Sequence, residues 1–319
     1  MGGLVDQLVR LRDLAKFRDP HRTAGGEPRA HVRLRALETV WFNTGTLCNL
    51  TCRNCYIESS PRNDRLAYLT RAEVARFLDE IAAESLPTRL IGFTGGEPFM
   101  NPAIILMLQD VLARGFHALV LTNAMKPMWK LREPLLALNK AHPGRMTIRV
   151  SIDHYSQAVH EAERGKRSWG PAIQGVVWLA RNGFAIDVAG RRFTGEPEQD
   201  LRAGFSRLFA ELDIPVDAHN PVHLVLFPEM DATRDVPEIT EGCWGILHKS
   251  PDDVMCASSR MVVKRKGAPQ PVVLACTLLA YDEQFELGRT LAEASRAAVS
   301  LNHPHCASFC VLGGAACSR

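Results

Sequence analysis

The sequence lacks a long apolar run, an excess of one charge, and a start typical of secreted proteins. No segment approaches the roughly 18 consecutive apolar residues that a membrane-spanning helix needs. Lys and Arg number 38 and Asp and Glu 35, a net charge of +3, so charge does not indicate a nucleic-acid or membrane-surface partner. The first residues show no basic segment followed by an apolar core. We therefore expect a cytoplasmic protein in a reducing compartment.

The remaining composition is typical of a globular protein. Of the 319 residues, 46% are hydrophobic and 23% are charged, values that exclude a disordered or fibrous chain. This length allows one large domain or two unequal ones.

Cysteine is unevenly distributed along the chain. Three of the nine cysteines lie close together near the N-terminus, and the other six lie in the last quarter of the chain. A reducing compartment does not favour disulfides, so clustered cysteines there indicate metal ligands. The nine are Cys48, Cys52, Cys55, Cys243, Cys256, Cys276, Cys306, Cys310 and Cys317.

Strand and helix patterns alternate between residues 37 and 230. Apolar runs that predict strands lie at 37–43, 89–94, 118–122, 146–153, 185–189 and 221–226. Patterns of helical period lie between them, the first after the capping box Thr70-x-x-Glu73 and the others at 103–114, 129–140, 171–181 and 199–212. Six such units predict an α/β fold with a parallel sheet, a partial (β/α)6 barrel similar to a TIM barrel. Functional groups are expected where its strands end.

Two further regions flank the predicted barrel at 37–230. Residues 1–36 contain an amphipathic pattern at 4–17, which predicts a helix, followed by a loop rich in Gly, Pro, His and Arg. Residues 231–319 contain short strands, turns and six cysteines. They predict a smaller domain folded around a metal centre.

The first cysteine cluster follows the first strand at C-x3-C-x2-C spacing. Three thiolates can ligate three irons of a cube-shaped cluster and leave the fourth iron open to a small molecule. Soft thiolate ligands favour iron–sulfur clusters or zinc. Zinc is the alternative, although a structural zinc site has four ligands and usually shows paired C-x2-C knuckles.

This segment, with Tyr56 directly after Cys55, resembles the cluster loop of the radical S-adenosylmethionine (SAM) superfamily. Thr94-Gly95-Gly96-Glu97-Pro98, at the next strand end, is similar to that family's GGEP motif, which receives the SAM amino group. Further positions resemble the polar SAM contacts of the family. The resemblance implies SAM binding by Tyr56, Gly95, Gly96, Glu97, Asn123, Ser151, Asp153 and Arg164.

The same resemblance implies the chemistry. A 4Fe–4S cluster held by Cys48, Cys52 and Cys55 passes one electron to SAM, and the 5′-deoxyadenosyl radical then removes a hydrogen atom from the substrate in a dry, enclosed site. An electron donor such as flavodoxin or ferredoxin is implied as well. Arg191, at the fifth strand end, is a candidate for holding a carboxylate or phosphate of SAM or substrate.

The C-terminal cysteines resemble the SPASM/twitch group of the superfamily. The resemblance assigns Cys256, Cys276, Cys306 and Cys310 to an auxiliary 4Fe–4S cluster, with Cys317 as an alternative ligand. A full SPASM domain usually has seven cysteines in this region and this chain has six, so we expect one auxiliary cluster. A zinc site is the alternative.

Cys243 has two interpretations. It is either a buried small apolar residue or a hydrogen-atom donor, as in radical epimerases. Arg260 and the run 264–266 are expected to form a solvated turn, with contact to an anionic substrate or electron donor as the alternative.

Three functions follow from this sequence. The first is oxidation or crosslinking of a small molecule or peptide, with an auxiliary cluster accepting an electron. A small molecule is favoured because no segment is long enough for a separate peptide-recognition domain. The second is epimerisation that uses Cys243. The third is a non-catalytic iron–sulfur or zinc protein, a scaffold or redox sensor.

Overall fold

The computed structural model describes residues 15–229, 231 and 234–314. Most of the helix predicted at 4–17 lies outside these residues, and so does Cys317.

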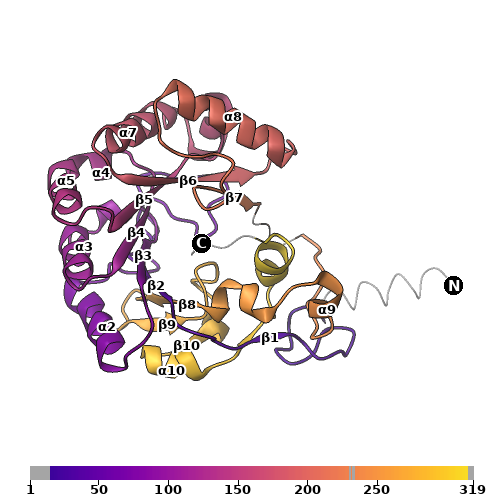
Figure 1. Ribbon diagram of the computed structural model, residues 1–319. Coiled ribbons are helices and arrows are strands. Elements are labelled where there is room, and N and C mark those ends of the chain that lie inside the picture. The colour runs from indigo at the N-terminus through magenta and orange to yellow at the C-terminus, as the bar shows by residue number, and fades with distance from the viewer. Residues whose placement is uncertain (1–14, 230, 232–233, 315–319) are drawn as a thin grey trace.

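A nine-stranded sheet forms the centre of the molecule (Figure 1). Six of its strands are parallel and adjacent in chain order, so a crossover joins each to the next. They are β2 (Thr39–Asn43), β3 (Leu90–Thr94), β4 (His117–Thr122), β5 (Met146–Ser151), β6 (Ala185–Arg192) and β7 (Leu224–Pro228). The predicted parallel sheet is confirmed.

The C-terminal strands continue this sheet beyond β2. β8 (Ser259–Val263) pairs in parallel with β2, and β9 (Val272–Leu274) and β10 (Glu286–Gly288) follow antiparallel. A separate two-stranded sheet joins β1 (His31–Val32) to β11 (Val299–Ser300). The domain boundary near residue 230 stays a prediction, because the sheet runs on across it.

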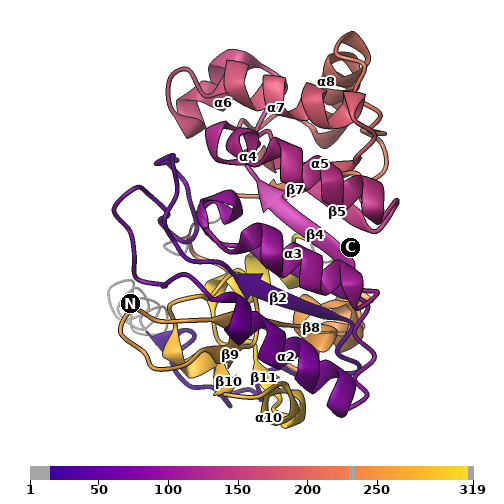
Figure 2. The same cartoon turned by 90° about the vertical axis from the view of Figure 1, so that its left-hand side faces the viewer.

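Helices cover the outer side of the strand arc (Figures 1 and 2). The capping box at Thr70 and Glu73 is present at the start of the first of them. The α-helices are α2 (Arg71–Ala83), α3 (Ile104–Ala113), α4 (Lys126–Lys130), α5 (Arg132–Ala141), α6 (Gln157–Arg164), α7 (Trp169–Arg181), α8 (Glu198–Glu211), α9 (Cys243–Leu247) and α10 (Leu291–Arg296). The 3-10 helices are η1 (Pro98–Met100), η2 (Pro251–Asp253), η3 (Met255–Ala257) and η4 (Glu283–Phe285), and η5 (Cys306–Val311) is a π-helix.

Helix α6 is absent from the sequence prediction because it has few apolar positions. Its buried residues are His160 and Glu163, so no apolar stripe indicates the helix. Its last residue, Arg164, nevertheless belongs to the predicted site.

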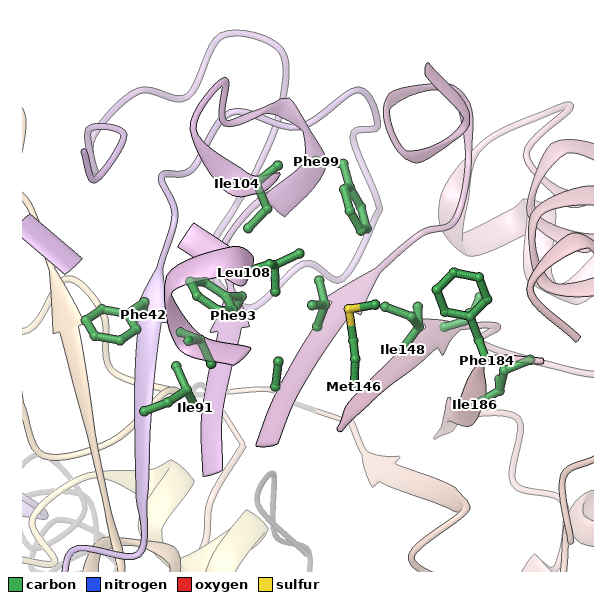
Figure 3. Close-up of a cluster of buried hydrophobic side chains, with 14 of the residues drawn as sticks. Phe42, Ile91, Phe93, Phe99, Ile104, Leu108, Met146, Ile148, Phe184 and Ile186 are labelled. Atoms are coloured by element: carbon green, nitrogen blue, oxygen red, sulfur yellow. The ribbon is translucent and has the colours of Figure 1, made fainter. Parts of the chain in front are cut away.

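The main core lies between the strands and the outer helices (Figure 3). Ile91 and Phe93 of β3 pack there with Ile104 and Leu108 of α3. The strands are buried on both faces, which is why they read as continuous apolar runs rather than alternating ones.

The C-terminal region contacts both end strands of the open arc, β2 and β7. β8 borders β2, and η5 lies against β7, where the rings of Phe227 and Phe309 stack with centroids 5.4 Å apart. Among the described residues, no helix combines the length and apolarity needed to cross a bilayer.

Helix α7 approaches the segment after β4 at a glycine, which gives a test of this packing. A Cβ at Gly175 would lie 2.0 Å from the carbonyl oxygen of Ala124, whereas a Cβ at Gly170 of the same helix would meet nothing within 4 Å. We expect Gly175→Ala to lower the free energy of unfolding by about 1–3 kcal/mol. Gly170→Ala should change it by less, because its Cβ would meet no neighbouring segment. Denaturant unfolding followed by circular dichroism measures both, and equal effects would contradict the close approach.

Candidate active site and cysteine-lined cavity

A pocket of about 1110 Å³, measured out to its mouth, lies at the carboxyl ends of the barrel strands. The loop after β2 contributes the first cysteine cluster, and the ends of β3 to β7, helix α6 and the C-terminal region contribute the other walls. The structure thus brings together most of the predicted site. The predicted residues that line the pocket are Cys48, Cys52, Cys55, Tyr56, Gly95, Gly96, Asn123, Ser151, Asp153, Arg164 and Arg191.

The two glycines after β3 allow the close approach of two backbone segments. Gly96 N donates to Gly45 O at 2.8 Å, and Glu97 N donates to Leu47 O at 3.1 Å. A Cβ at Gly96 would lie 2.3 Å from Leu47 O, and Gly95 has a φ of +134°, which favours glycine. These residues therefore hold the cysteine loop directly against the end of β3.

The carboxylate of Glu97 does not line the pocket. Its side chain is buried and accepts hydrogen bonds from Thr122 Oγ1 (2.8 Å), Asn123 N (2.9 Å) and Phe99 N (3.1 Å). Burial raises the pKa of Glu97 to about 7, although these donors lower it. Glu97 thus ties the end of β3 to the end of β4, and its contact with SAM stays a prediction.

Asp153 and Arg164 form a bidentate ion pair in the pocket wall. Arg164 Nε donates to Asp153 Oδ2 at 2.9 Å, and Arg164 Nη2 donates to Asp153 Oδ1 at 2.8 Å. Two of the three guanidinium nitrogens are therefore occupied by Asp153. Burial raises the pKa of Cys52, and the positive charge of Arg164 partly offsets this increase.

Two polar residues of the site, Asn54 and Glu163, have no signal of their own in the sequence. Glu163 precedes Arg164 on α6, and its Oε2 accepts from Asn54 Nδ2 at 2.9 Å and from Arg191 Nη1 at 3.4 Å. Arg191 Nη2 is buried and, within the described part of the chain, has no hydrogen-bond partner. This network holds Arg191 between the cysteine loop and α6.

Four of the C-terminal cysteines line a second, smaller cavity. They are Cys256, Cys276, Cys306 and Cys310. The other lining side chains are apolar except for His305. Leu278 lines both this cavity and the larger pocket, so the two share a wall.

Cys243 lies in neither cavity. It begins α9, and its sulfur accepts a hydrogen bond from Thr240 N at 3.3 Å. Its role as a hydrogen-atom donor stays a prediction that this position does not support.

The two cysteine sets fit a multinuclear cluster. Burial raises the pKa of Cys48 to about 12 and that of Cys256 to about 11, so bound cations are needed to hold these thiols as thiolates. Among the described residues, no three His, Cys, Asp or Glu side chains converge as ligands of a single ion. In an iron–sulfur cluster the ligands bind different irons, which suits cysteines spread around a common cavity.

Comparison with known families identifies the domain that contains the barrel strands. Residues 42–200 match the sequence profile of the family described as the radical SAM superfamily. The chain belongs to the radical SAM superfamily. The superfamily predicted from the sequence is confirmed, and this family implies SAM and a 4Fe–4S cluster.

Two curated relatives match the radical SAM chain over part of its length. The antilisterial bacteriocin subtilosin biosynthesis protein AlbA of Bacillus subtilis is 29% identical over 143 residues, 44% of this chain and 30% of AlbA. Mycofactocin maturase MftC of Mycobacterium ulcerans is 25% identical over 138 residues, 43% of this chain and 35% of MftC. The matches thus span about a third of each relative.

A solved structure shows the fold of the radical SAM chain. Streptococcus suis SuiB bound to the precursor peptide SuiA superimposes with a TM-score of 0.61 at 13% identity, over 83% of this chain and 66% of SuiB. The predicted partial barrel is confirmed by this likeness.

Proposed function

We propose that this chain is a peptide-modifying radical SAM enzyme that cleaves SAM reductively and removes a hydrogen atom from its substrate. The main support for this proposal is that three cysteines, Gly95, Gly96 and the Asp153–Arg164 pair line the same pocket. When bound, the cluster supplies the electron that cleaves SAM. An external donor such as flavodoxin or ferredoxin supplies that electron to the protein.

The residues of this chain have distinct tasks in the proposal. Cys48, Cys52 and Cys55 hold three corners of the cluster and leave the fourth for SAM. The backbone carbonyl groups of Gly95 and Gly96 and the side chain of Ser151 offer hydrogen bonds to SAM, since the Gly96 N–H is already bonded to Gly45 O. The Asp153–Arg164 pair keeps a fixed charge distribution beside it. Apolar side chains from distant segments wall the pocket and exclude water. They include Leu121, Phe227, Leu278 and Phe309.

A peptide substrate is favoured by the relatives rather than by the sequence. AlbA is named for bacteriocin biosynthesis, and SuiB is described bound to a precursor peptide. A small molecule was the substrate expected from the sequence. A peptide substrate and a small-molecule substrate can be compared in a single assay.

We further propose that residues 231–319 hold one auxiliary 4Fe–4S cluster on Cys256, Cys276, Cys306 and Cys310. These cysteines line one cavity, and Leu278 separates it from the SAM pocket. A redox group there is suited to accept the second electron when a substrate radical is oxidised. This position favours oxidation or crosslinking over epimerisation, since Cys243 lines neither cavity.

The decisive assay uses anaerobically reconstituted full-length protein with SAM and a chemical reductant. We expect 5′-deoxyadenosine to form, and faster with peptides encoded beside the gene than with small molecules. The modified peptide should lose hydrogen, and it should gain no deuterium at carbon in deuterated water. Absence of 5′-deoxyadenosine would favour a scaffold or sensor instead, and deuterium incorporation would favour an epimerase.

The auxiliary ligands have their own prediction. We expect Cys256→Ala with Cys276→Ala to lower bound iron by about half, because one of two four-iron clusters is lost. Reductive SAM cleavage should persist, since the first cluster remains. Cys243→Ala serves as the matched control and should retain all the iron. If the unmodified protein holds zinc at this site, or if the double variant retains all the iron, the auxiliary cluster is contradicted.

A further inference from the structure

Arg260 occupies a position that the sequence pattern does not predict. It was expected in a solvated basic turn, yet the structure buries it completely within β8. That expectation is wrong for Arg260, because β8 begins before it and pairs it with Val40 of β2. The neighbouring basic residues behave differently, since Lys264 pairs with Glu73 and Lys266 pairs with Asp64.

The hydrogen-bond partners of Arg260 are all uncharged backbone carbonyls. Nη1 donates to Cys256 O at 2.6 Å and to Ser259 O at 2.8 Å, and Nε donates to Ala294 O of α10 at 3.1 Å. Nη2 is buried and has no partner among the residues that the structure describes. The guanidinium is therefore held firmly in place, but nothing in this set neutralises its charge.

Two other fully buried arginines of this chain have a carboxylate partner, which Arg260 lacks among the described residues. Arg29 forms an ion pair with Glu238 at 2.5 Å, and Arg149 forms one with Asp187 at 3.1 Å. Within the described ranges no such carboxylate pairs with Arg260. A buried charge requires an opposite charge nearby, because burial removes the water that would otherwise stabilise it.

Arg260 is bound to the backbone of a cysteine of the second cavity. Its Nη1 donates to Cys256 O at 2.6 Å, and Cys256 and Cys276 both line the cavity of four cysteines. A neutral thiol provides no counter-charge. Four thiolates that hold a 4Fe–4S cluster carry more negative charge than the cluster core offsets, so the loaded site is anionic.

We propose that Arg260 is the counter-charge of the cluster held by Cys256, Cys276, Cys306 and Cys310, and that it raises the reduction potential of that cluster. The inference rests on the proposed auxiliary cluster. Reduction adds a negative charge, and a fixed cation nearby stabilises the reduced form more than the oxidised form. Burial at Arg260 keeps this interaction from being screened by solvent and salt.

The test isolates the auxiliary cluster. A parent protein with Cys48, Cys52 and Cys55 all replaced by alanine retains only the C-terminal site, and its midpoint potential is measured by redox titration with paramagnetic resonance. We expect Arg260→Gln to shift the potential to lower values, because the charge is removed while a hydrogen-bond donor remains. Arg260→Lys should stay close to the parent. Lys266→Gln, which removes an exposed charge, is the matched control and should leave the potential unchanged.

The outcomes separate the two proposals. If the parent binds no iron, the auxiliary cluster and the role of Arg260 both fail. If the parent binds iron and Arg260→Gln leaves the potential unchanged, or Arg260→Lys shifts it equally, the counter-charge role alone is overturned. Arg260→Gln could fold and yet lose its iron. In that case the role of charge is supported if Arg260→Lys keeps both the iron and the midpoint potential of the parent. Loss of iron in both variants overturns it.

Discussion

Replacing Cys48, Cys52 and Cys55 together by alanine is expected to abolish 5′-deoxyadenosine formation. The three thiols are buried or half-buried around one pocket with Gly95 and Gly96, and no other described cysteine lines that pocket. Bound iron should fall from about eight to about four atoms per chain, because the auxiliary set is untouched. Product chromatography and iron analysis of anaerobically reconstituted protein measure both effects.

This result complements the variant that lacks Cys256 and Cys276. Each variant should lose about half of the iron, but only loss of the first set should stop SAM cleavage. Retained cleavage without Cys48, Cys52 and Cys55 would refute the assignment of the catalytic cluster. Circular dichroism of both variants shows whether the fold persists, since the main core lies between strands and helices away from these cysteines.

Gly96→Ala should have the second largest effect on activity. A Cβ at this position would lie 2.3 Å from Leu47 O and 2.6 Å from the carbonyl carbon of Leu47, so the backbone before Cys48 must move. Displacement of a reacting group by about 1 Å can lower a rate about 100-fold. We expect a loss of about this size in SAM cleavage, with secondary structure preserved.

A control for this substitution comes from α9. A Cβ at Gly245 would meet nothing within 4 Å, so Gly245→Ala should leave SAM cleavage at the level of the unmodified protein. Steady-state formation of 5′-deoxyadenosine compares the two variants directly. Unchanged cleavage in Gly96→Ala would mean that the cysteine loop does not depend on its contact with the end of β3.

The prediction of the barrel succeeded where the signals are local. Periodicity and apolar runs indicated the six parallel strands, and Thr70 with Glu73 indicated the start of α2. Helix α6 was missed because His160 and Glu163, rather than an apolar stripe, are its buried residues. Local sequence determines local structure well only when burial leaves a regular apolar pattern.

The part of the site that lies on one short segment was predicted, because its signal is local. Cys48, Cys52 and Cys55 lie on one loop, so their spacing alone indicates a shared ligand set. Leu278 and Phe309 reach the same pocket from the C-terminal region, and no pattern in the sequence connects them to it. Their place depends on η5 lying against β7.

The order of the residues specifies which ligands are available, whereas packing between distant segments specifies what surrounds them. The spacing of the cysteines and Gly95-Gly96 already indicated a site for SAM and a cluster. Packing alone turned the Glu97 carboxylate to the end of β4 and buried Arg260 beside Cys256. The type of side chain follows from the sequence, but its direction and its charge environment depend on contacts between residues that are far apart in the chain.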